Sequence, residues 1–432
     1  MPAVNKDSIP GSVQDAYCLF IERGDRVRKE MLTGNAAAAW GVRLAEADYV
    51  PSYPITPQTE IIETLARWIC DGSMDAKFVT MDSEHSMITA AGAASATGVR
   101  VFTATSSQGI LYGFEMFYTV AGWRVPLVMV NVSRGLSSPI TLEPDHNDIL
   151  STRDSGFLQI HCETCQEVLD SILIAYRLAE DERVLLPVIV NMDGFYLSFT
   201  REPVEVPDLK DVKTFLPPYR PKHAFFKASQ PMAQGVAALG GPLYSYFKYQ
   251  MHLAGLKALE VYHEISHEFR KTFGRKHGVC EGYMLDDAEY VLVMTNSFST
   301  LGKAAVKRAR EKGIKAGLLR LRLLRPFPGV DIATVMKSRK AVAVIDQNIS
   351  VGKGGILHSE IASCLYNDET NPYMLSFIGG LGGKNISPVE FDFIFDSMIK
   401  TAETGKVPPE KLLYTESEWK EVERLKRIAG KG

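Results

Sequence analysis

Long apolar runs are missing from this chain, and so is an excess of charge of one sign. No apolar stretch approaches the roughly 18 residues that a membrane-spanning helix needs. The formal net charge of −3 gives no electrostatic case for binding nucleic acid or an anionic membrane. The first residues carry charges and no apolar signal core, so we expect no secretory peptide. These absences predict a protein that binds neither nucleic acid nor membrane.

Cysteine is also scarce, with 6 residues in a chain of 432. So few thiols do not form a disulfide framework, and they favour a reducing cytoplasm. Only Cys162 and Cys165 form a CxxC pair, whereas zinc and iron–sulfur sites need about four ligands. We interpret the pair as ordinary packing, with a metal or redox role as the alternative, and predict no metal site. Gly-x-Gly-x-x-Gly and Walker A motifs are absent, which excludes the usual dinucleotide and P-loop sites.

Strand-like and helical segments alternate through the first half of the chain. Residues 125–132 form a continuous apolar strand, as expected when both faces of a sheet are covered. Residues 58–70 place apolar side chains at helical spacing, and Thr33 or Asn35 is suited to cap an alanine-rich helix. An aromatic-rich helix is expected over 110–121 and a long loop over 136–148. This alternation predicts an α/β fold with a doubly wound parallel sheet.

Four strand-like segments run into small or polar residues, at 48–50, 78–81, 101–104 and 127–132. In open α/β sheets, ligands bind at the carboxyl ends of the strands. Thr56, Glu84, Gly109 and Arg134 all follow these segments. We therefore expect one hydroxyl, one carboxylate, one glycine turn and one guanidinium to face a single crevice.

The rest of the chain divides by composition. Five prolines mark residues 201–222 as an extended linker, and a helix is expected over 245–274. A second, smaller α/β domain starts near residue 290. Residues 401–432 form a helical, charged tail, and we interpret its charge run over 416–426 as a solvated face. Residues 1–27 form an extension with one short helix at 13–22, whose role the sequence does not reveal.

Ten motifs together resemble one family, the α subunit of pyruvate:ferredoxin oxidoreductase and related 2-oxoacid:acceptor oxidoreductases, over roughly residues 30–400. They are Tyr53–Pro57, Ser83–Ser86, Phe102–Gly109, Ser133–Arg134, Asp145–Asp148, Arg153–Gly156, Asp193–Phe195, Lys248–Met251, Arg322–Pro328 and Gly379–Gly383. The resemblance implies a thiamine diphosphate pyrimidine-binding domain over 28–260, which includes the linker, and a transketolase C-terminal-like domain over 261–400.

The resemblance also implies partner subunits. A Gly-Asp-Gly motif, which usually anchors the divalent metal of a thiamine diphosphate site, is absent. A β subunit would then hold the diphosphate and Mg²⁺. Iron–sulfur [4Fe-4S] clusters would lie on β or on γ and ferredoxin-like subunits, and electrons would pass to ferredoxin or another acceptor.

By the same resemblance, three residues take roles in catalysis or substrate binding. Glu84 matches the glutamate that hydrogen-bonds the cofactor pyrimidine; its alternative is an acid that stabilises a helix N-terminus. Arg134 matches the arginine that holds the substrate carboxylate; its alternative is an ion pair with Asp145 or Asp148. Thr56 matches a threonine beside cofactor and substrate, and its alternative is to cap the following helix.

Further residues are expected around the cofactor. The cofactor-binding set comprises Tyr53, Pro54, Ile55, Glu84, Ser107, Gln108 and Gly109. His85 is expected to shape the pocket rather than react. Tyr112, Phe114, Phe117 and Tyr118 recur at helical spacing, which is typical of a core, although some could stack on the pyrimidine.

The predicted function is CoA-dependent oxidative decarboxylation of a 2-oxoacid to an acyl-CoA and CO₂. Pyruvate-type relatives tend to carry alanine where Gly135 stands, so the substrate could be larger, such as the aryl-2-oxoacid phenylglyoxylate; otherwise Gly135 is a neutral turn residue and the nearby rings are core. Two alternatives stay open: a non-oxidative thiamine-dependent decarboxylase or transketolase-like subunit, and a non-catalytic scaffold of the same fold.

Overall fold

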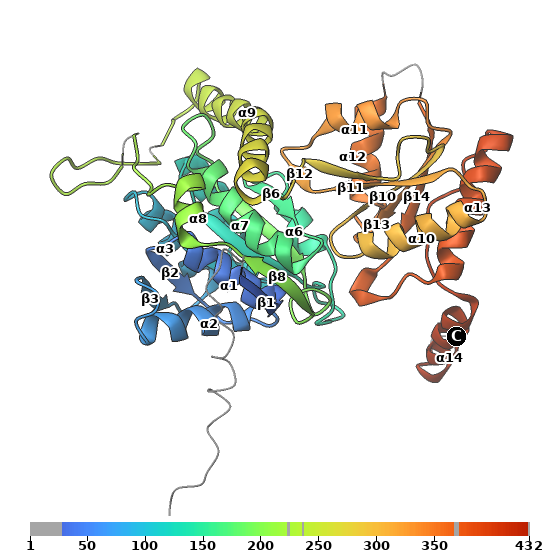
Figure 1. Cartoon of the computed structure of the whole chain (residues 1–432), viewed down its shortest axis with the longest axis horizontal. Helices are drawn as coiled ribbons and strands as arrows, with labels where there is room; N and C mark the ends of the chain where they lie inside the picture. Colours follow the sequence, from blue (N-terminus) through green and yellow to red (C-terminus); the bar gives the residue numbers. More distant parts are fainter. Residues whose placement is uncertain (1–27, 223–224, 236, 367–370, 431–432) are drawn as a thin grey trace, which may run out of the picture.

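The computed structural model describes residues 28–222, 225–235, 237–366 and 371–430. The chain forms two α/β lobes side by side, the first coloured blue to yellow-green and the second mainly orange to red (Figure 1). The expected N-terminal extension and its helix at 13–22 lie outside the described residues. No helix in the described part combines the length and the apolar content needed to cross a membrane.

The first lobe is built on a mainly parallel five-stranded sheet. Its strands are β4 (Phe102–Thr105), β5 (Val128–Ser133), β6 (Leu158–His161), β7 (Val188–Asp193) and β12 (Leu323–Arg325), in spatial order β12-β6-β7-β5-β4. Only β12 runs antiparallel to its neighbour. In β5, Val128, Val130 and Val132 face one hydrophobic core and Met129 faces the other, so both faces are covered.

Two further strands pair parallel with each other: β2 (Tyr49–Ser52) and β3 (Lys77–Thr80). A single parallel bridge between Tyr49 and Val101 joins them to the start of β4. Pro51 has no N–H to donate to a ladder. The Pro51 carbonyl accepts the Thr103 hydroxyl at 2.8 Å, which also holds β2 beside β4. The carboxyl ends of β2 and β3 therefore lie at the same edge as those of β4 and β5.

Helices cover both faces of the sheet. One layer comprises α1 (Gly34–Leu44), α2 (Thr59–Cys70), α7 (Cys165–Ala179) and α9 (Pro242–Phe273), and the other comprises α3 (Glu84–Ser95), α4 (Gln108–Tyr112) and α5 (Phe114–Trp123). Thr33 caps α1 by accepting the Ala36 N–H at 3.0 Å, one of the two predicted caps. A Cβ on Gly41 would lie 3.0 Å from Ile172, so the small residues of α1 permit close packing on α7. The doubly wound α/β prediction is confirmed.

The second lobe is a smaller α/β unit. Its sheet has the order β15-β14-β13-β10-β11-β9, and all pairs are parallel except β11 with β9. The strands are β9 (Cys280–Tyr283), β10 (Tyr290–Thr295), β11 (Ala316–Leu321), β13 (Ala341–Asp346), β14 (Tyr373–Ile378) and β15 (Lys411–Leu412). The helices are α10 (Ser299–Glu311), α11 (Gly329–Met336), α12 (Ile356–Leu365), α13 (Pro388–Thr404) and α14 (Glu416–Ile428). No residue of α14 is buried, which agrees with a solvated charged tail.

Local structure differs from the sequence prediction in three places. Much of the expected linker at 201–222 is ordered: β8 (Arg201–Val206) pairs antiparallel with β1 (Arg28–Thr33), and α8 (Leu209–Phe215) follows. The expected helix at 110–121 breaks at Gly113, where a Cβ would lie 2.4 Å from Ile88. The short helix α6 (Asn147–Ser151) begins within the expected loop at 136–148.

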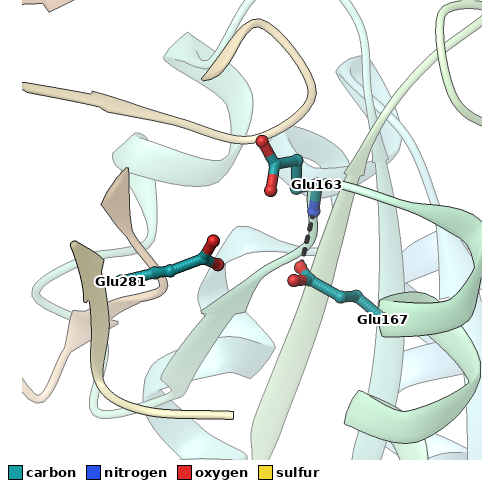
Figure 2. A group of neighbouring side chains, drawn as sticks. All are labelled: Glu163, Glu167 and Glu281. Carbon is teal, nitrogen blue, oxygen red and sulfur yellow. Dashed lines mark hydrogen bonds between the residues drawn. The ribbon is translucent and has the colours of Figure 1, made fainter. Parts of the chain in front are cut away.

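Buried ion pairs join the lobes. Figure 2 shows the carboxylates of Glu163, Glu167 and Glu281 converging from the β6–α7 connection, α7 and β9. Arg320 donates to Glu167 at 2.8 and 3.1 Å and to Glu281 at 2.6 Å. Arg322 donates to Glu167 at 2.5 Å, and Lys303 donates to Glu163 and Glu281. Three cations thus accompany three carboxylates, so the cluster acts as an ionic contact between lobes rather than as a ready cation site.

Candidate active site

The loops after β2, β4 and β5 meet at the carboxyl edge of the first sheet. The Arg134 guanidinium, beyond β5, donates from Nη1 to the Thr56 carbonyl at 2.6 Å and from Nη2 to Gln108 Oε1 at 2.5 Å. Gly109 follows Gln108 and lies directly against the Glu84 carboxylate. The structure therefore brings the four predicted groups into one continuous set of contacts.

Glu84 is the first residue of α3. Ser83 caps this helix, since its Oγ accepts the Ser86 N–H at 3.2 Å. The Glu84 residue is only 4% exposed, and no other residue in the described part hydrogen-bonds to its carboxylate. Burial raises the pKa of Glu84. Its place in the first turn suits the alternative role of stabilising a helix N-terminus, but only its own backbone N–H bonds the carboxylate in the described part, which leaves acceptor capacity for a further donor.

Gly109 and Thr105 form a tight wall beside this carboxylate. A Cβ on Gly109 would lie 2.7 Å from Glu84 Oε1 and 2.1 Å from Thr105 Oγ1, so only glycine fits. The Thr105 hydroxyl is buried and has no hydrogen-bond partner in the described part of the chain. Sequence reasoning did not single out Thr105. Its position directly before the Ser106–Gly109 turn is the signal that could have found it.

Arg134 is 6% exposed, yet its guanidinium contacts no carboxylate within 4.0 Å among the described residues. Asp148 accepts only the backbone N–H of Arg134, at 3.1 Å, and Asp145 makes no ion pair with it in the described part. The predicted alternative, a side-chain ion pair with one of these acids, is therefore not formed. Arg134 Nε is buried and no described residue accepts its hydrogen, so the guanidinium retains donors for a carboxylate.

The other predicted residues have different surroundings. Thr56 is exposed and does not cap α2, whose N-cap is Gln58. The Gln58 side chain instead donates to the Tyr53 carbonyl at 3.0 Å and holds the turn that contains Pro54 and Ile55. His85 is partly exposed, and its Nε2 lies 3.4 Å from Glu115 rather than within the set of contacts.

Ser107 and Gln108 fix the turn after β4. Ser107 has a φ of +47°, which is uncommon for a residue with a side chain. Its Oγ donates to the Gly135 carbonyl at 2.8 Å and also contacts Gln108 Oε1 at 2.7 Å. Gln108 Nε2 donates to Ser137 at 2.8 Å. The Gln108 side-chain oxygen therefore accepts from Arg134, and its nitrogen donates to the loop that carries Ser137.

The aromatic residues separate into core and surface. Phe117 is fully buried, and its ring centroid lies 4.7 Å from that of Phe157. Tyr112 is 64% exposed and Tyr118 is 39% exposed, on the outer side of α4 and α5. Phe114 contacts Tyr118 edge to face. The predicted core role therefore holds for Phe117, whereas the two tyrosines are available to a neighbouring molecule.

The expected free space beside Gly135 is not present. A Cβ at this position would lie 2.4 Å from the methyl carbon of Thr141. The loop that follows therefore fills the volume that a glycine would otherwise release, and Gly135 gives no extra room for a larger substrate.

The CxxC pair is buried in packing. Cys162 and Cys165 are both free thiols, and Cys162 Sγ contacts the Ser171 hydroxyl at 3.4 Å. Burial raises the pKa of Cys162 to about 12 and also raises that of Cys165. Metal binding and thiol exchange require thiolates. This geometry agrees with the packing interpretation.

Family comparisons agree with the fold and the motifs. Residues 41–270 match the family described as pyruvate flavodoxin/ferredoxin oxidoreductase, thiamine diP-bdg. Residues 288–391 match pyruvate:ferredoxin oxidoreductase core domain II. Together the two matches cover most of the chain.

Curated relatives match nearly their whole length. Pyruvate synthase subunit PorA of Pyrococcus abyssi is 40% identical over 379 residues, which is 88% of this chain and 96% of the relative. The PorA subunit of Methanocaldococcus jannaschii is 42% identical over 361 residues, which is 83% of this chain and 91% of that subunit. Ketoisovalerate oxidoreductase subunit VorA of Pyrococcus abyssi is 38% identical over 397 residues, which is 92% of this chain and 98% of that subunit.

A solved structure shares the fold. The 2-oxoglutarate:ferredoxin oxidoreductase from Magnetococcus marinus, with 2-oxoglutarate, coenzyme A and succinyl-CoA bound, superposes with a TM-score of 0.66 at 19% identity. The match covers 86% of this chain and 65% of that one, so this chain spans just under two thirds of that protein. With the two family matches and the relatives near 40% identity, the chain belongs to the 2-oxoacid:ferredoxin oxidoreductases, as an α subunit of the PorA and VorA type.

Proposed function

We propose that this chain supplies the pyrimidine-binding half of a thiamine diphosphate site, in an enzyme that converts a 2-oxoacid and CoA into an acyl-CoA and CO₂. Electrons leave through iron–sulfur clusters on partner subunits to ferredoxin or another acceptor. One observation carries the proposal: the Glu84 carboxylate, nearly buried and hydrogen-bonded by no other described residue, lies against Gly109 at the edge where Arg134 Nε has no partner among the described residues. The CoA step is supported by the solved relative, which has coenzyme A and succinyl-CoA bound.

The residues present fit the pyrimidine ring. Glu84 can accept a hydrogen bond from a protonated ring nitrogen, and the buried Thr105 hydroxyl has no hydrogen-bond partner among the described residues. Gly109 leaves the ring-side wall free of a side chain. Bound thiamine diphosphate supplies the carbon nucleophile and the electron sink that decarboxylation needs. Glu84 then holds a proton at the pyrimidine nitrogen, and the low-dielectric surroundings strengthen that hydrogen bond.

Arg134 is proposed to bind the 2-oxoacid carboxylate. Its guanidinium is oriented by Thr56 and Gln108, which occupy one hydrogen on each terminal nitrogen. Nε and the remaining N–H groups can meet a carboxylate in a bidentate fork. The exposed Thr56 hydroxyl is available to the substrate oxygen from the opposite loop. Tyr53, Pro54, Ile55, Ser107 and Gln108 shape the cofactor side through their turns.

A second subunit is proposed to complete the site. The chain lacks the Gly-Asp-Gly metal motif, so the diphosphate and Mg²⁺ are assigned to a β subunit. Leu111, Tyr112 and Tyr118 are exposed on α4 and α5, next to the helix turn that carries Gly109. Exposed aromatic residues of this kind are enriched at protein interfaces. The relatives' names as subunits support the same division, with γ and ferredoxin-like subunits carrying clusters.

The test of the proposal is Glu84→Gln in the complex purified without oxygen. The amide keeps the size of the side chain but cannot hold the pyrimidine proton in the same way. We expect 2-oxoacid- and CoA-dependent reduction of a viologen dye to fall by about 10²–10⁴-fold, the usual range for a proton-handling group. Glu311→Gln is the matched control, because Glu311 is exposed at the end of α10 in the second lobe, away from the proposed site and interface.

Three results would contradict the proposed function. Glu84→Gln activity within about twofold of wild type, with subunits still assembled, would remove Glu84 from catalysis. Release of an aldehyde without any CoA requirement would favour the non-oxidative alternative, and a colourless, inactive wild-type oligomer would favour the scaffold.

For the substrate, we propose a small 2-oxoacid of the pyruvate or 2-ketoisovalerate size rather than an aryl-2-oxoacid. The support is the methyl of Thr141, which fills the space beside Gly135, together with the names of the relatives. Each methylene in an apolar pocket changes discrimination by roughly 1–3 kcal/mol. We expect kcat/KM for pyruvate or 2-ketoisovalerate to exceed that for phenylglyoxylate by at least about tenfold. A preference for phenylglyoxylate would restore the aryl hypothesis.

A further inference from the structure

Asp148 is the most highly hydrogen-bonded side chain at the candidate site. It lies on α6 and is completely buried. Its Oδ2 accepts the backbone N–H groups of Ser107 and Arg134, both at 3.1 Å, and Asn131 Nδ2 at 3.1 Å. Its Oδ1 accepts the Ser133 hydroxyl and the N–H of the following residue, both at 2.6 Å. Five donors therefore converge on one carboxylate.

This carboxylate joins two loops that carry different functions. Ser107 belongs to the turn after β4, which presents Gln108 and Gly109 to the proposed cofactor site. Arg134 is the first residue after β5 and forms the proposed carboxylate clamp. Because one oxygen atom accepts a backbone N–H from each loop, Asp148 sets the separation between the loops. Its own side chain is too deeply buried to contact substrate.

Asp148 also stabilises an unfavourable backbone conformation. Ser107 has a φ of +47°, a backbone conformation that is unfavourable for a residue with a side chain and persists only where neighbouring contacts hold it. Two hydrogen bonds hold it there: its N–H to Asp148 and its Oγ to the Gly135 carbonyl. Without the first bond, the turn is expected to relax and to carry Gln108 away from Arg134.

We propose that Asp148 is a positioning residue for the 2-oxoacid reaction: its buried carboxylate clamps the Ser107–Gly109 turn to the Arg134 strand end, so that cofactor and substrate sites depend on it together. This proposal rests on the proposed function for the identity of the two ligands. The clamp itself is a property of the described chain and can be tested without turnover.

The first experiment uses hydrogen exchange on the assembled complex. Asp148→Asn keeps the shape of the side chain but replaces one acceptor oxygen by a donor that faces other donors. We expect faster exchange of the backbone amides in 105–110 and in 133–136 together. Asp170→Asn is the matched control, since Asp170 is equally buried but binds Arg275 and His277 far from these loops. Unchanged exchange in both segments of the Asp148 variant would overturn the clamp.

The second experiment reads ligand binding. Loss of a hydrogen bond to a charged group weakens an interaction by about tenfold or more, so Asp148→Asn is expected to weaken thiamine diphosphate binding and raise the KM for the 2-oxoacid, each by about that factor. The control variant is expected to lower thermal stability without raising that KM. Both constants within about twofold of wild type would overturn the positioning role.

Two provisions keep the tests separate. If wild type binds thiamine diphosphate but oxidises no 2-oxoacid, the proposed function fails while hydrogen exchange still decides the clamp. If Asp148→Asn does not assemble, Ser133→Ala removes the 2.6 Å bond to Oδ1 and the 3.0 Å contact of the same hydroxyl with the Asp145 carbonyl, and leaves the four other donors to Asp148 in place. We then expect the same two segments to exchange faster by a smaller factor, and no change in either segment would overturn the proposal.

Discussion

Replacing Glu167 by glutamine should destabilise the contact between the lobes. The Glu167 carboxylate accepts two hydrogen bonds from Arg320, one from Arg322 and one from the Glu163 N–H. Removing one partner of a buried ion pair costs about 3–5 kcal/mol, because the remaining charge stays buried. Here two fully buried guanidinium groups would lose their shared acceptor charge.

The expected decrease in Tm for Glu167→Gln follows from the length of the chain. At about 2.1 cal/mol/K per residue, unfolding of 432 residues carries an entropy of about 0.9 kcal/mol/K. A loss of about 3–5 kcal/mol then lowers the Tm by roughly 3–5 °C if the lobes unfold together. Differential scanning calorimetry of identically purified proteins measures this shift.

The matched control for Glu167→Gln is Glu264→Gln. Glu264 makes a two-pronged pair with Arg183 at 2.7 and 3.1 Å, but both side chains are largely exposed. Exposed pairs contribute about 0–1 kcal/mol, so we expect a Tm change of at most about 1 °C. Equal shifts for the two variants would refute the view that burial makes the inter-lobe cluster important.

The same ion pairs predict a dependence on pH. Burial alone would raise the pKa of Glu167, but Arg322 and Arg320 outweigh burial and lower it to about 2. The folded state thus favours the charged form. The contribution is fully present above the ordinary value of 4.5 and is lost as the pH falls towards 2. The Tm difference between wild type and Glu167→Gln should therefore stay constant from neutral pH to about pH 5 and shrink below 4.5.

Two further variants or reagents test the local structure. Brief alkylation of the native protein should label the exposed Cys70 and spare Cys162 and Cys165, because burial raises the pKa values of these two thiols. Peptide mass spectrometry measures the labelling, and rapid labelling of the CxxC pair would restore a redox role for it. Gly109→Ala should displace the Glu84 carboxylate, since the new Cβ would lie 2.7 Å from Glu84 Oε1. We expect thiamine diphosphate binding to weaken about tenfold or more while far-UV circular dichroism stays unchanged. Unaltered binding would show that Glu84 does not line the cofactor site.

Patterns local in sequence predicted most of the fold. Helical spacing identified the helix expected over 58–70, and its observed bounds, Thr59–Cys70, differ by one residue. The polar strand ends correctly grouped Thr56, Glu84, Gly109 and Arg134 at one edge, because parallel strands deliver their carboxyl ends together. Those inferences needed only periodicity and the geometry of a parallel sheet.

Features that depend on contacts between residues far apart in the sequence could not be predicted from the sequence. Pro203 suggested a linker, but it lies in a two-stranded edge ribbon, where a missing N–H is tolerated. The contact of Arg320 with Glu167 spans 153 positions and leaves no periodic trace. Glycine at 135 implied free space, whereas Thr141 fills it. Asp148 appeared only as a possible partner for the Arg134 side chain, and its contacts with two backbone loops require the folded chain.

The short strand β12 affects how this protein can be divided. Its residues come from the sequence of the second lobe, yet they pair with β6 and form the outer strand of the first sheet. A gene fragment that stops before residue 323 would leave β6 with an open row of unpaired backbone groups, a known template for aggregation. The two lobes are therefore not interchangeable modules. Attempts to express the first lobe alone, or to swap the second lobe between relatives at a boundary near residue 280, should carry β12 with the first sheet or replace its pairing.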